Sequence, residues 1–164
     1  MNTIFILQKR KIQSTISQKA VWIFLLFLIS VSLKAQPPAP LATAATGKNS
    51  SGFTTTWNAS AGATGYRIDV ATNNTFASIV PGYGNLDVSN VLSYDITGLN
   101  ANTTYYYRVK AYDGIGASAN SNTITAITAP AAPGALVPTV YTATGFTARW
   151  NAATGATGYR IDVA

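Results

Sequence analysis

The sequence predicts an all-β protein: one two-sheet β-sandwich of about seven strands, followed by an incomplete second sandwich. After residue 35, helical periodicity is absent, and short alternating runs rich in Thr, Val, Ile and Tyr lie between clusters of Gly, Asn and Pro. A stretch of twenty residues recurs 93 positions further along the chain. The chain has no cysteine, so such a domain has to be held together by core packing without disulfide bonds.

The first 35 residues have the three parts of a secretory signal. Basic residues at 9–11 and 19 precede an apolar stretch over 20–33, and the small residue Ala35 precedes a plausible cleavage point. We expect a helical signal segment that is removed, leaving a mature chain that begins at Gln36 and is secreted or displayed at the cell surface. The alternative is an uncleaved membrane anchor. Because Ser30, Ser32 and Lys34 interrupt the apolar stretch before about 20 residues, the sequence favours cleavage and no stable membrane span afterwards.

The positive charge of the chain lies mostly in this leader. Five of the eleven basic residues fall within residues 1–35, where there is no acid, and the remaining six face five aspartates. The part that follows the leader therefore has a net charge of +1 and no cluster of Lys and Arg that would neutralise a run of phosphates. A nucleic-acid partner is not expected.

The recurring stretch defines the domain organisation. Gly52–Ala71 and Gly145–Ala164 are identical at sixteen of twenty positions. A period of 93 residues is too long for a solenoid turn and fits one small β-domain. Proline-rich segments at 37–40 and 129–133 read as semi-rigid linkers. The expected organisation is a signal peptide over 1–35, a complete domain over 36–129, and the start of a second domain over 130–164.

Strands of the complete copy are predicted from period-two alternation between turn residues. On each, one face carries large apolar side chains and the other carries polar ones, so Arg67 and Asp69 are expected to face water. The predicted strands are Leu41–Ala45, Gly52–Asn58, Thr64–Ala71, Phe76–Val80, Val91–Ile96, Thr104–Tyr112 and Asn122–Thr128. The predicted structural core is Phe53, Trp57, Tyr66, Ile68, Leu99, Tyr105, Tyr107, Val109, Trp150 and Tyr159.

Three motifs carry a family resemblance. A Trp stands on the second strand at Trp57, Gly-Tyr-Arg-Ile follows at 65–68, and residues 99–111 contain Leu, a short turn, Thr, then Tyr and a strand that ends Arg-Val-Lys-Ala. This pattern resembles the fibronectin type III domain, which implies an immunoglobulin-like β-sandwich. The resemblance also implies that Tyr105 forms a tyrosine corner, with its hydroxyl bonded to upstream backbone. Ala101 stands where the family often has proline.

A second and weaker resemblance is compositional. The leader, the absence of cysteine, the Asn/Thr/Gly/Ala bias and the near-identical copies are similar to large surface proteins of Bacteroidetes-type bacteria.

The sequence offers almost nothing for catalysis. The chain has no His, no Cys and no Glu, which removes imidazole-based nucleophile–base pairs, thiolate chemistry and the usual metal ligands. The five aspartates are scattered along the chain. We therefore expect no enzyme, no cofactor and no metal, although a weak calcium site at Asn85 and Asp87 stays open as an alternative.

The leading hypothesis for function is a non-catalytic extracellular module in which tandem repeats space or display other domains of a longer protein. The alternatives are a carbohydrate- or protein-binding adhesin module and an accessory domain of an extracellular enzyme. The partner would be an extracellular protein or glycan, together with further repeats of the same chain. Candidate interaction residues lie on the outward face of the long strand and at the hairpin tip that follows it: Tyr106, Tyr112, Asp113, Gly114 and Ile115.

The second copy supplies only the first three strands of a sandwich. We therefore expect that residues 131–164 cannot bury Trp150, Tyr159 and Ile161 on their own. The sequence is on this ground expected to be a fragment of a longer protein.

Overall fold

The computed structural model describes residues 34–163, so the predicted helical signal segment over 1–35 lies outside the described residues except for Lys34 and Ala35. Within that range the regular structure consists of strands, and no helix is long and apolar enough to cross a membrane. The first seven strands are β1 (Ala42–Asn49), β2 (Gly52–Trp57), β3 (Gly65–Ala71), β4 (Leu86–Asp87), β5 (Ser93–Ile96), β6 (Thr104–Tyr112) and β7 (Ile124–Ile127).

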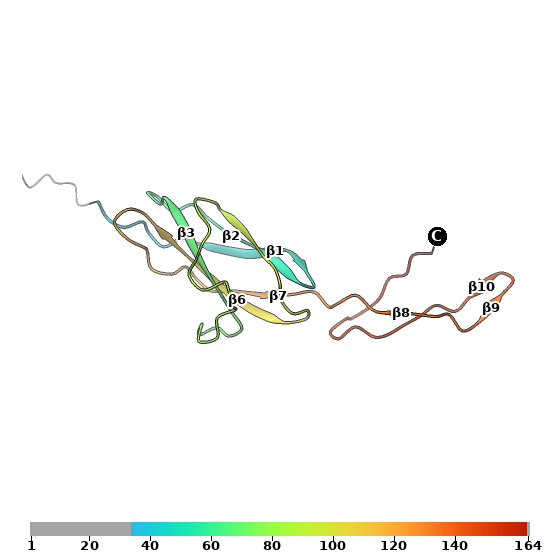
Figure 1. Ribbon diagram of the computed structural model, residues 1–164. Coiled ribbons are helices and arrows are strands. Elements are labelled where there is room, and N and C mark those ends of the chain that lie inside the picture. Colours follow the sequence, from blue (N-terminus) through green and yellow to red (C-terminus); the bar gives the residue numbers. More distant parts are fainter. Residues whose placement is uncertain (1–33, 164) are drawn as a thin grey trace, which may run out of the picture. The chain divides into compact units, whose positions relative to one another are not determined.

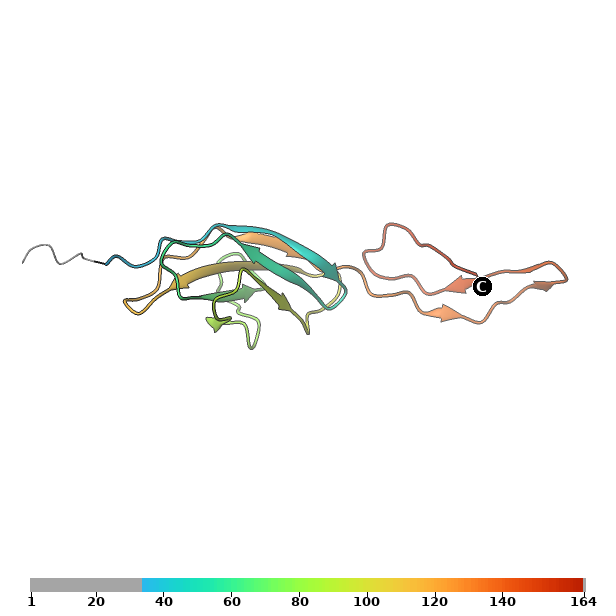
Figure 2. The same ribbon diagram turned by 90° about the horizontal axis from the view of Figure 1, so that it is seen from above.

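These seven strands form two antiparallel sheets that face each other (Figures 1 and 2). One sheet has the order β1-β2-β5, and the other has the order β4-β3-β6-β7. The central pairing of the second sheet joins Gly65–Ala71 to 106–112 over seven consecutive residue pairs. The predicted two-sheet sandwich is confirmed, and its longest ladder is built from the two strands that carry the family motifs.

Alternation along the strands produces the core. In β6, half-buried and buried side chains alternate along the whole strand. In β2 the residues Phe53, Thr55 and Trp57 are buried. The two sheets thereby bring aromatic side chains together: the Phe53 ring centroid lies 6.0 Å from that of Tyr107, and the Trp57 centroid lies 5.7 Å from that of Tyr66. Eight of the ten predicted core residues have exposed fractions between 0% and 7%: Phe53, Trp57, Tyr66, Ile68, Leu99, Tyr105, Tyr107 and Val109.

Two predicted core residues are not buried. Trp150 is 40% exposed and Tyr159 is 41% exposed, so placing them in a core was wrong for the described chain. The physical reason is that residues 130–163 contain no counterpart of the strands that cover Trp57 and Tyr66 in the first copy. The expectation that this segment cannot bury Trp150, Tyr159 and Ile161 is in turn confirmed, since Ile161 is 56% exposed.

The predicted strand at Phe76–Val80 is also wrong. Asn73 Oδ1 accepts a hydrogen bond from the Ala77 N–H at 3.0 Å, and Phe76 has a φ of 59°, a left-handed conformation that a β-strand excludes. The local turn formed by Asn73 therefore takes precedence over the apolar run. Only Ile79 makes an isolated bridge to Ala71, and β4 forms later, at Leu86–Asp87.

Two tyrosine hydroxyls fasten the crossover from β5 to β6, which connects the two sheets. The Tyr105 hydroxyl accepts a hydrogen bond from the Asn100 N–H at 3.0 Å, so the tyrosine corner implied by the resemblance is present. The Tyr83 hydroxyl accepts from the Thr97 N–H at 2.9 Å and donates to the Thr97 carbonyl at 3.0 Å. These three hydrogen bonds fix loop backbone between β5 and β6.

Residues after Pro130 form four two-residue strands: β8 (Ala135–Leu136), β9 (Tyr141–Thr142), β10 (Gly145–Phe146) and β11 (Arg149–Trp150). Their register repeats that of the first copy. Trp150 pairs with Ala135 as Trp57 pairs with Ala42, and Gly145 pairs with Thr142 as Gly52 pairs with Asn49. The second segment therefore reproduces the β1–β2 hairpin.

Candidate interaction surface

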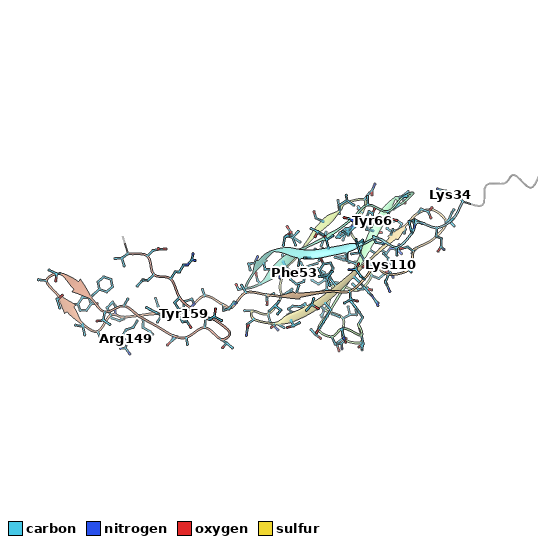
Figure 3. All side chains as sticks on the ribbon, turned by 180° about the vertical axis from the view of Figure 1, so that it is seen from behind. Lys34, Phe53, Tyr66, Lys110, Arg149 and Tyr159 are labelled. Carbon is cyan, nitrogen blue, oxygen red and sulfur yellow. The ribbon has the colours of Figure 1, made fainter. Side chains whose placement is uncertain are left out.

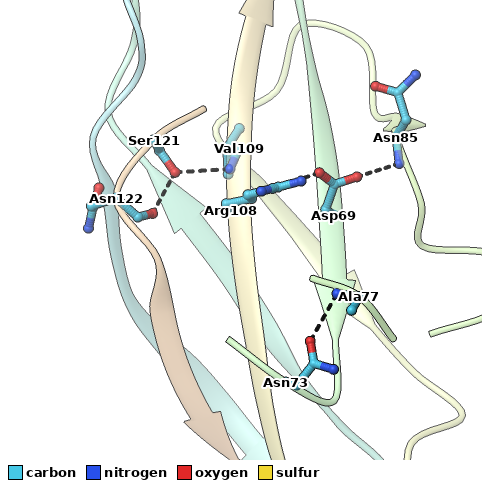
Figure 4. A network of polar contacts seen from close by, with 8 residues as sticks. All are labelled: Asp69, Asn73, Ala77, Asn85, Arg108, Val109, Ser121 and Asn122. Carbon is cyan, nitrogen blue, oxygen red and sulfur yellow. Dashed lines mark hydrogen bonds and ion pairs between the residues drawn. The ribbon is translucent and has the colours of Figure 1, made fainter. Parts of the chain in front are cut away.

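The outward face of the β4-β3-β6-β7 sheet carries a group of charged and aromatic side chains. Strand register places Arg67 beside Lys110 and Asp69 beside Arg108, while Ala71 lies beside Tyr106. Because successive residues of a strand point to opposite faces, these side chains stand on the side away from the core. Figure 4 shows the centre of this face, with Asp69 between Arg108 and Asn85.

An ion pair at the centre of this face joins two strands and a loop. Arg108 Nε lies 2.8 Å from Asp69 Oδ2, and Asp69 Oδ1 accepts a hydrogen bond from the Asn85 N–H at 2.7 Å (Figure 4). The Arg108 guanidinium also lies 4.0 Å from the centroid of the Phe76 ring, a distance typical of a cation–π contact. These contacts hold the loop 72–85 against the sheet.

The expectation that Asp69 faces water is wrong, because Asp69 is only 7% exposed. Its neighbours Arg108 and the Asn85 N–H satisfy both carboxylate oxygens, which makes the burial of the charge possible. The sequence held one clue to this arrangement. An Asp on one strand and an Arg on its partner strand become cross-strand neighbours once the register is known.

A second cluster lies at the end of the face where β6 stops. The Tyr112 ring covers Gly65 so closely that a Cβ at Gly65 would lie 2.4 Å from Tyr112 Cζ. The Tyr112 hydroxyl donates to Asp87 Oδ1 at 3.0 Å, and the Arg67 guanidinium lies 4.7 Å from the ring centroid. Arg67 Nε also lies 3.7 Å from Asp87 Oδ2. Tyr112 is therefore held in place by its neighbours.

This cluster moves two pKa values in opposite directions. The Ser89 N–H, the Tyr112 hydroxyl and the Arg67 guanidinium favour the charged carboxylate, so the pKa of Asp87 lies below its usual value. The hydrogen bond to Asp87 favours the neutral phenol, so the pKa of Tyr112 lies above its usual value. Asp87 Oδ1 accepts from both the Ser89 N–H and the Tyr112 hydroxyl.

This geometry does not support the calcium site at Asn85 and Asp87 that the sequence left open. The Asp87 oxygens face Ser89, Tyr112 and Arg67, and the Asn85 backbone donates to Asp69. Within residues 34–163 no three His, Cys, Asp or Glu side chains gather in a group that could hold a metal ion.

The hairpin tip after β6 is a tight turn closed by Asp113. Its Oδ1 accepts hydrogen bonds from the Ile115 N–H at 2.8 Å and the Gly116 N–H at 3.1 Å, and its own N–H donates to the Gly116 carbonyl at 3.0 Å. Asp113 is 8% exposed, whereas Ile115 is 50% exposed. Asp113 thus shapes the tip, while Gly114 and Ile115 are the residues that the tip presents to solvent.

The structure separates the predicted interaction residues into two groups. Tyr112, Asp113, Gly114 and Ile115 lie together at one end of β6. Tyr106 is six residues away in the same strand, about 20 Å at 3.3 Å per residue, opposite Ala71 and Thr125. Arg108 and Lys110 stand between the two groups on the same face. One continuous aromatic patch is therefore not formed.

Comparison with known proteins places these features in a family. The family model for the fibronectin type III domain matches residues 37–127. Chitinase A1 from Niallia circulans is 34% identical over 141 residues, and a Kelch domain-containing protein from Saccharolobus solfataricus is 34% identical over 127 residues; each alignment covers 76% of this chain, but only 19% and 17% of those proteins. The chain thus spans about a fifth of the length of the curated relatives it matches.

Among solved structures, a crystal structure of β-1,2-glucanase from Parabacteroides distasonis aligns with a TM-score of 0.50 at 21% identity, over 62% of this chain and 14% of that chain. This likeness concerns the fold. The family match covers more than half of the chain, and it coincides with the seven-strand sandwich, its buried Trp57 and its tyrosine corner at Tyr105. This protein belongs to the fibronectin type III family.

Proposed function

We propose that the chain is part of a non-catalytic extracellular protein in which tandem fibronectin type III domains space or display other domains. Domains of this family are commonly extracellular structural or accessory modules. The observation that carries the proposal is the second copy. Residues 130–163 repeat the hairpin register of the first copy, and the Trp150 and Tyr159 rings lie 5.6 Å apart, close to the 5.7 Å between Trp57 and Tyr66.

The polar contacts of the outward face support a structural role. The charged side chains Arg67, Asp69, Asp87 and Arg108 are engaged with one another, with Tyr112 or with loop backbone. Groups held in this way stabilise a sheet and a loop. The chain supplies no His, Cys or Glu for acid–base or nucleophilic chemistry.

Small-angle X-ray scattering tests the spacing role. The protein to use is 36–164 extended by a second copy of residues 72–128, which completes the second repeat because residue 164 corresponds to residue 71. With domain centres about 40 Å apart, two sandwiches in line give a radius of gyration of about 23 Å, whereas one globule of that length gives about 16 Å. A radius of gyration of about 16 Å would reject the proposed spacing role.

The linker offers a matched control for this measurement. Inserting Gly-Ser-Gly-Ser between Ala129 and Pro130 in the same protein makes the connection more flexible and keeps Pro130 and Pro133, whose counterparts Pro37 and Pro40 are buried in the first domain. We expect a broader distribution of distances between the two domains in the insertion variant. Equal curves for both proteins would mean that the native connection is already flexible.

A second candidate is a binding or accessory role in an extracellular enzyme that acts on a polysaccharide. It is favoured by the 34% identity to chitinase A1 and by the exposed tip residue Ile115 beside Tyr112. Sedimentation of the chain 36–164 with insoluble chitin tests it. Retention that is lost in the Ile115→Asp variant and kept in Val91→Asp, an exposed apolar residue outside the tip, would support this role. Equal retention of all three proteins, or none, would count against it.

A further inference from the structure

The β1-β2-β5 sheet of the first domain has an open edge at β5. β5 pairs with β2 on one side only, and β2 carries Phe53, which Figure 3 shows within the first domain. Residues 91–95 are all exposed, and they include the apolar side chains of Val91, Leu92 and Tyr94. The segment contains no proline, lysine or bulge, the features with which proteins commonly protect such an edge.

The opposite edge of the same sheet, at β1, is closed by a side chain. Asn122 Oδ1 accepts a hydrogen bond from the Ala42 N–H at 2.9 Å, and Asn122 Nδ2 donates to the Ala42 carbonyl at 3.0 Å. The β1–β2 register also shifts twice, between Thr43 and Thr46 and between Thr46 and Asn49. A capped main chain and an irregular strand both hinder the addition of a further strand to β1.

The main chain of β5 presents hydrogen-bonding groups to the open edge at alternate residues. The Trp57 N–H donates to the Leu92 carbonyl at 3.1 Å, so Leu92 directs its main-chain groups to β2. Tyr94 does the same, whereas Ser93 and Asp95 direct theirs away from β2. Within the described residues, no hydrogen bond joins the N–H or C=O groups of Ser93 and Asp95 to an element other than β2.

The next residue that faces this edge, Thr97, is already occupied. The Tyr83 hydroxyl accepts from the Thr97 N–H and donates to the Thr97 carbonyl, as the main chain of a neighbouring strand would. Tyr83 therefore closes the edge beyond β5 and leaves it open at Ser93 and Asp95. These two residues are about 7 Å apart along the strand, which is the repeat of the main-chain groups of another strand.

A hollow lies beside this edge. Its volume of about 550 Å³ is within the range of ligand-binding clefts. Because Leu86 belongs to β4 and Tyr94 to β5, the hollow lies between the edges of the two sheets. All its lining residues are uncharged, and most are apolar or aromatic; they include Val80, Pro81, Tyr83, Leu86, Tyr94 and Thr97.

One wall of the hollow is fixed by backbone hydrogen bonds. Residues 80–83 form a turn in which the Tyr83 N–H donates to the Val80 carbonyl at 3.0 Å, and Gly82 has a φ of 85°, as a type II turn requires. The Val70 N–H donates to the Tyr83 carbonyl at 2.9 Å, and the Val70 carbonyl accepts from the Val80 N–H at 2.9 Å. The turn is thus joined to β3 at both ends, and the hollow does not depend on a bound ligand for its shape.

We propose that the β5 edge and this hollow form one docking site for an extended segment of a partner protein, added to β5 as an antiparallel strand. Hydrogen bonds to Ser93 and Asp95 hold its main chain, and an apolar side chain opposite Tyr94 enters the hollow. A basic side chain opposite Asp95 lies on the outward face, beside the only charged residue of β5. The partner segment therefore has the pattern basic, apolar, polar, apolar. The proposal does not rest on the spacing role.

Amide exchange measured by NMR on the chain 36–164 tests this site. The probe is the synthetic peptide Gly-Thr-Lys-Phe-Thr-Val-Thr-Gly, which places Lys opposite Asp95 and Phe opposite Tyr94. At ten times its measured Kd, the peptide should slow exchange of the Ser93 and Asp95 amides about tenfold. The Tyr94 amide, which is already directed to β2, should change less.

A matched peptide separates strand addition from adhesion to an apolar surface. It has proline in place of the Thr between Phe and Val, which removes the N–H that would bond to the Ser93 carbonyl. Protection by the first peptide alone supports the proposal. Equal protection by both peptides, or by neither, overturns it. Protection without peptide that rises with chain concentration also overturns it, because a second copy of the chain would then occupy the edge.

A charge exchange tests the predicted register. Asp95→Lys should weaken binding of the Lys peptide about fivefold and should favour a peptide with Glu in place of Lys. Thr125→Lys, which adds the same charge to the exposed edge strand β7 of the other sheet, is the control and should leave both affinities unchanged. Equal affinity of the wild-type chain for the Lys and Glu peptides would overturn the proposed partner.

Discussion

At the residue scale, the stability of the domain depends on aromatic side chains that bridge the two sheets. Trp57 is 3% exposed and contacts Tyr66, while Phe53 of the same strand contacts both Tyr105 and Tyr107. Each of these side chains buries a large apolar area, worth about 1.5–3 kcal/mol by itself. Because the chain has no disulfide, these contacts have no covalent support.

Trp57→Ala tests this dependence. We expect a loss of about 3–5 kcal/mol in the free energy of unfolding, because the cavity left behind cannot be filled. That loss is close to the whole stability of many small domains. Trp57→Phe is the matched control. Trp57 Nε1 is buried without a hydrogen-bond partner, so phenylalanine removes an unsatisfied polar atom as well as volume, and the loss should be smaller. Equal urea midpoints for wild type and Trp57→Ala would contradict the role of Trp57.

Tyr105→Phe isolates the tyrosine corner. The substitution keeps the buried ring and removes the acceptor for the Asn100 N–H. We expect a loss of about 1 kcal/mol, the usual worth of one hydrogen bond. Tyr106→Phe, in the same strand but on the outward face, serves as the control and should change the urea midpoint less. A larger loss from Tyr106→Phe would show that the corner contributes little.

The Asp87–Tyr112 pair makes stability depend on pH at both ends. The pKa of Asp87 is lowered on folding, so its contribution is present above the ordinary carboxyl value of 3.8 and is lost as the pH falls through the folded value. The pKa of Tyr112 is raised, so its contribution is present below the ordinary value of 10.0 and is lost as the pH rises through the folded value. Urea midpoints measured against pH should therefore fall less steeply in acid for Asp87→Asn than for wild type. If the urea midpoint falls equally steeply in acid for both proteins, carboxyl groups other than Asp87 account for the loss of stability.

At the element scale, loop 72–85 is the part of the domain that the sequence described least well. The apolar run Phe76–Val80 reads as a strand, yet Asn73 turns the chain and Phe76 leaves the sheet to stack on Arg108. Alternation predicts which residues face inward, as in β6, because that depends on the strand itself. It cannot predict the partner of Asp69, because that depends on strand register and on a loop that returns from elsewhere.

Arg108→Met tests whether this ion pair holds the loop. Methionine keeps much of the length of the side chain but leaves the Asp69 carboxylate buried without its cation. We expect a loss of about 1–3 kcal/mol, less than for a fully buried pair because Arg108 is partly exposed. The Asn85 amide should exchange faster with solvent than in wild type. Lys110→Met, on the same face, is the control. Unchanged exchange at Asn85 would show that the loop is held by other contacts.

At the scale of the whole molecule, most of the fold could be predicted from the sequence, whereas the arrangement of the candidate interaction residues could be predicted only in part. The repeat offset, the buried Trp57 and the corner at Tyr105 are local patterns, and the structure contains all three features. Whether Tyr106 and Tyr112 form one patch depends on distance along a strand and on neighbours such as Gly65 and Asp87. Such neighbours become visible only when the sheet is assembled.

The boundary of the first domain can be tested by truncation. Its last anchored residues are Thr128 and Ala129. Thr128 Oγ1 accepts a hydrogen bond from the Thr103 N–H at 3.0 Å and donates one to the Asn100 carbonyl at 2.7 Å. The Ala129 N–H donates to the Asn49 carbonyl at 2.9 Å. We expect a chain of residues 36–130 to melt at the same temperature as 36–164. A chain that ends at Ala126 loses these bonds and should melt several degrees lower, since about 1 kcal/mol shifts the melting temperature of such a domain by about 4–8 °C. Calorimetry of the three proteins measures these melting temperatures. A lower melting temperature for 36–130 would show that the first domain draws stability from residues after Pro130, so that the two copies do not fold independently.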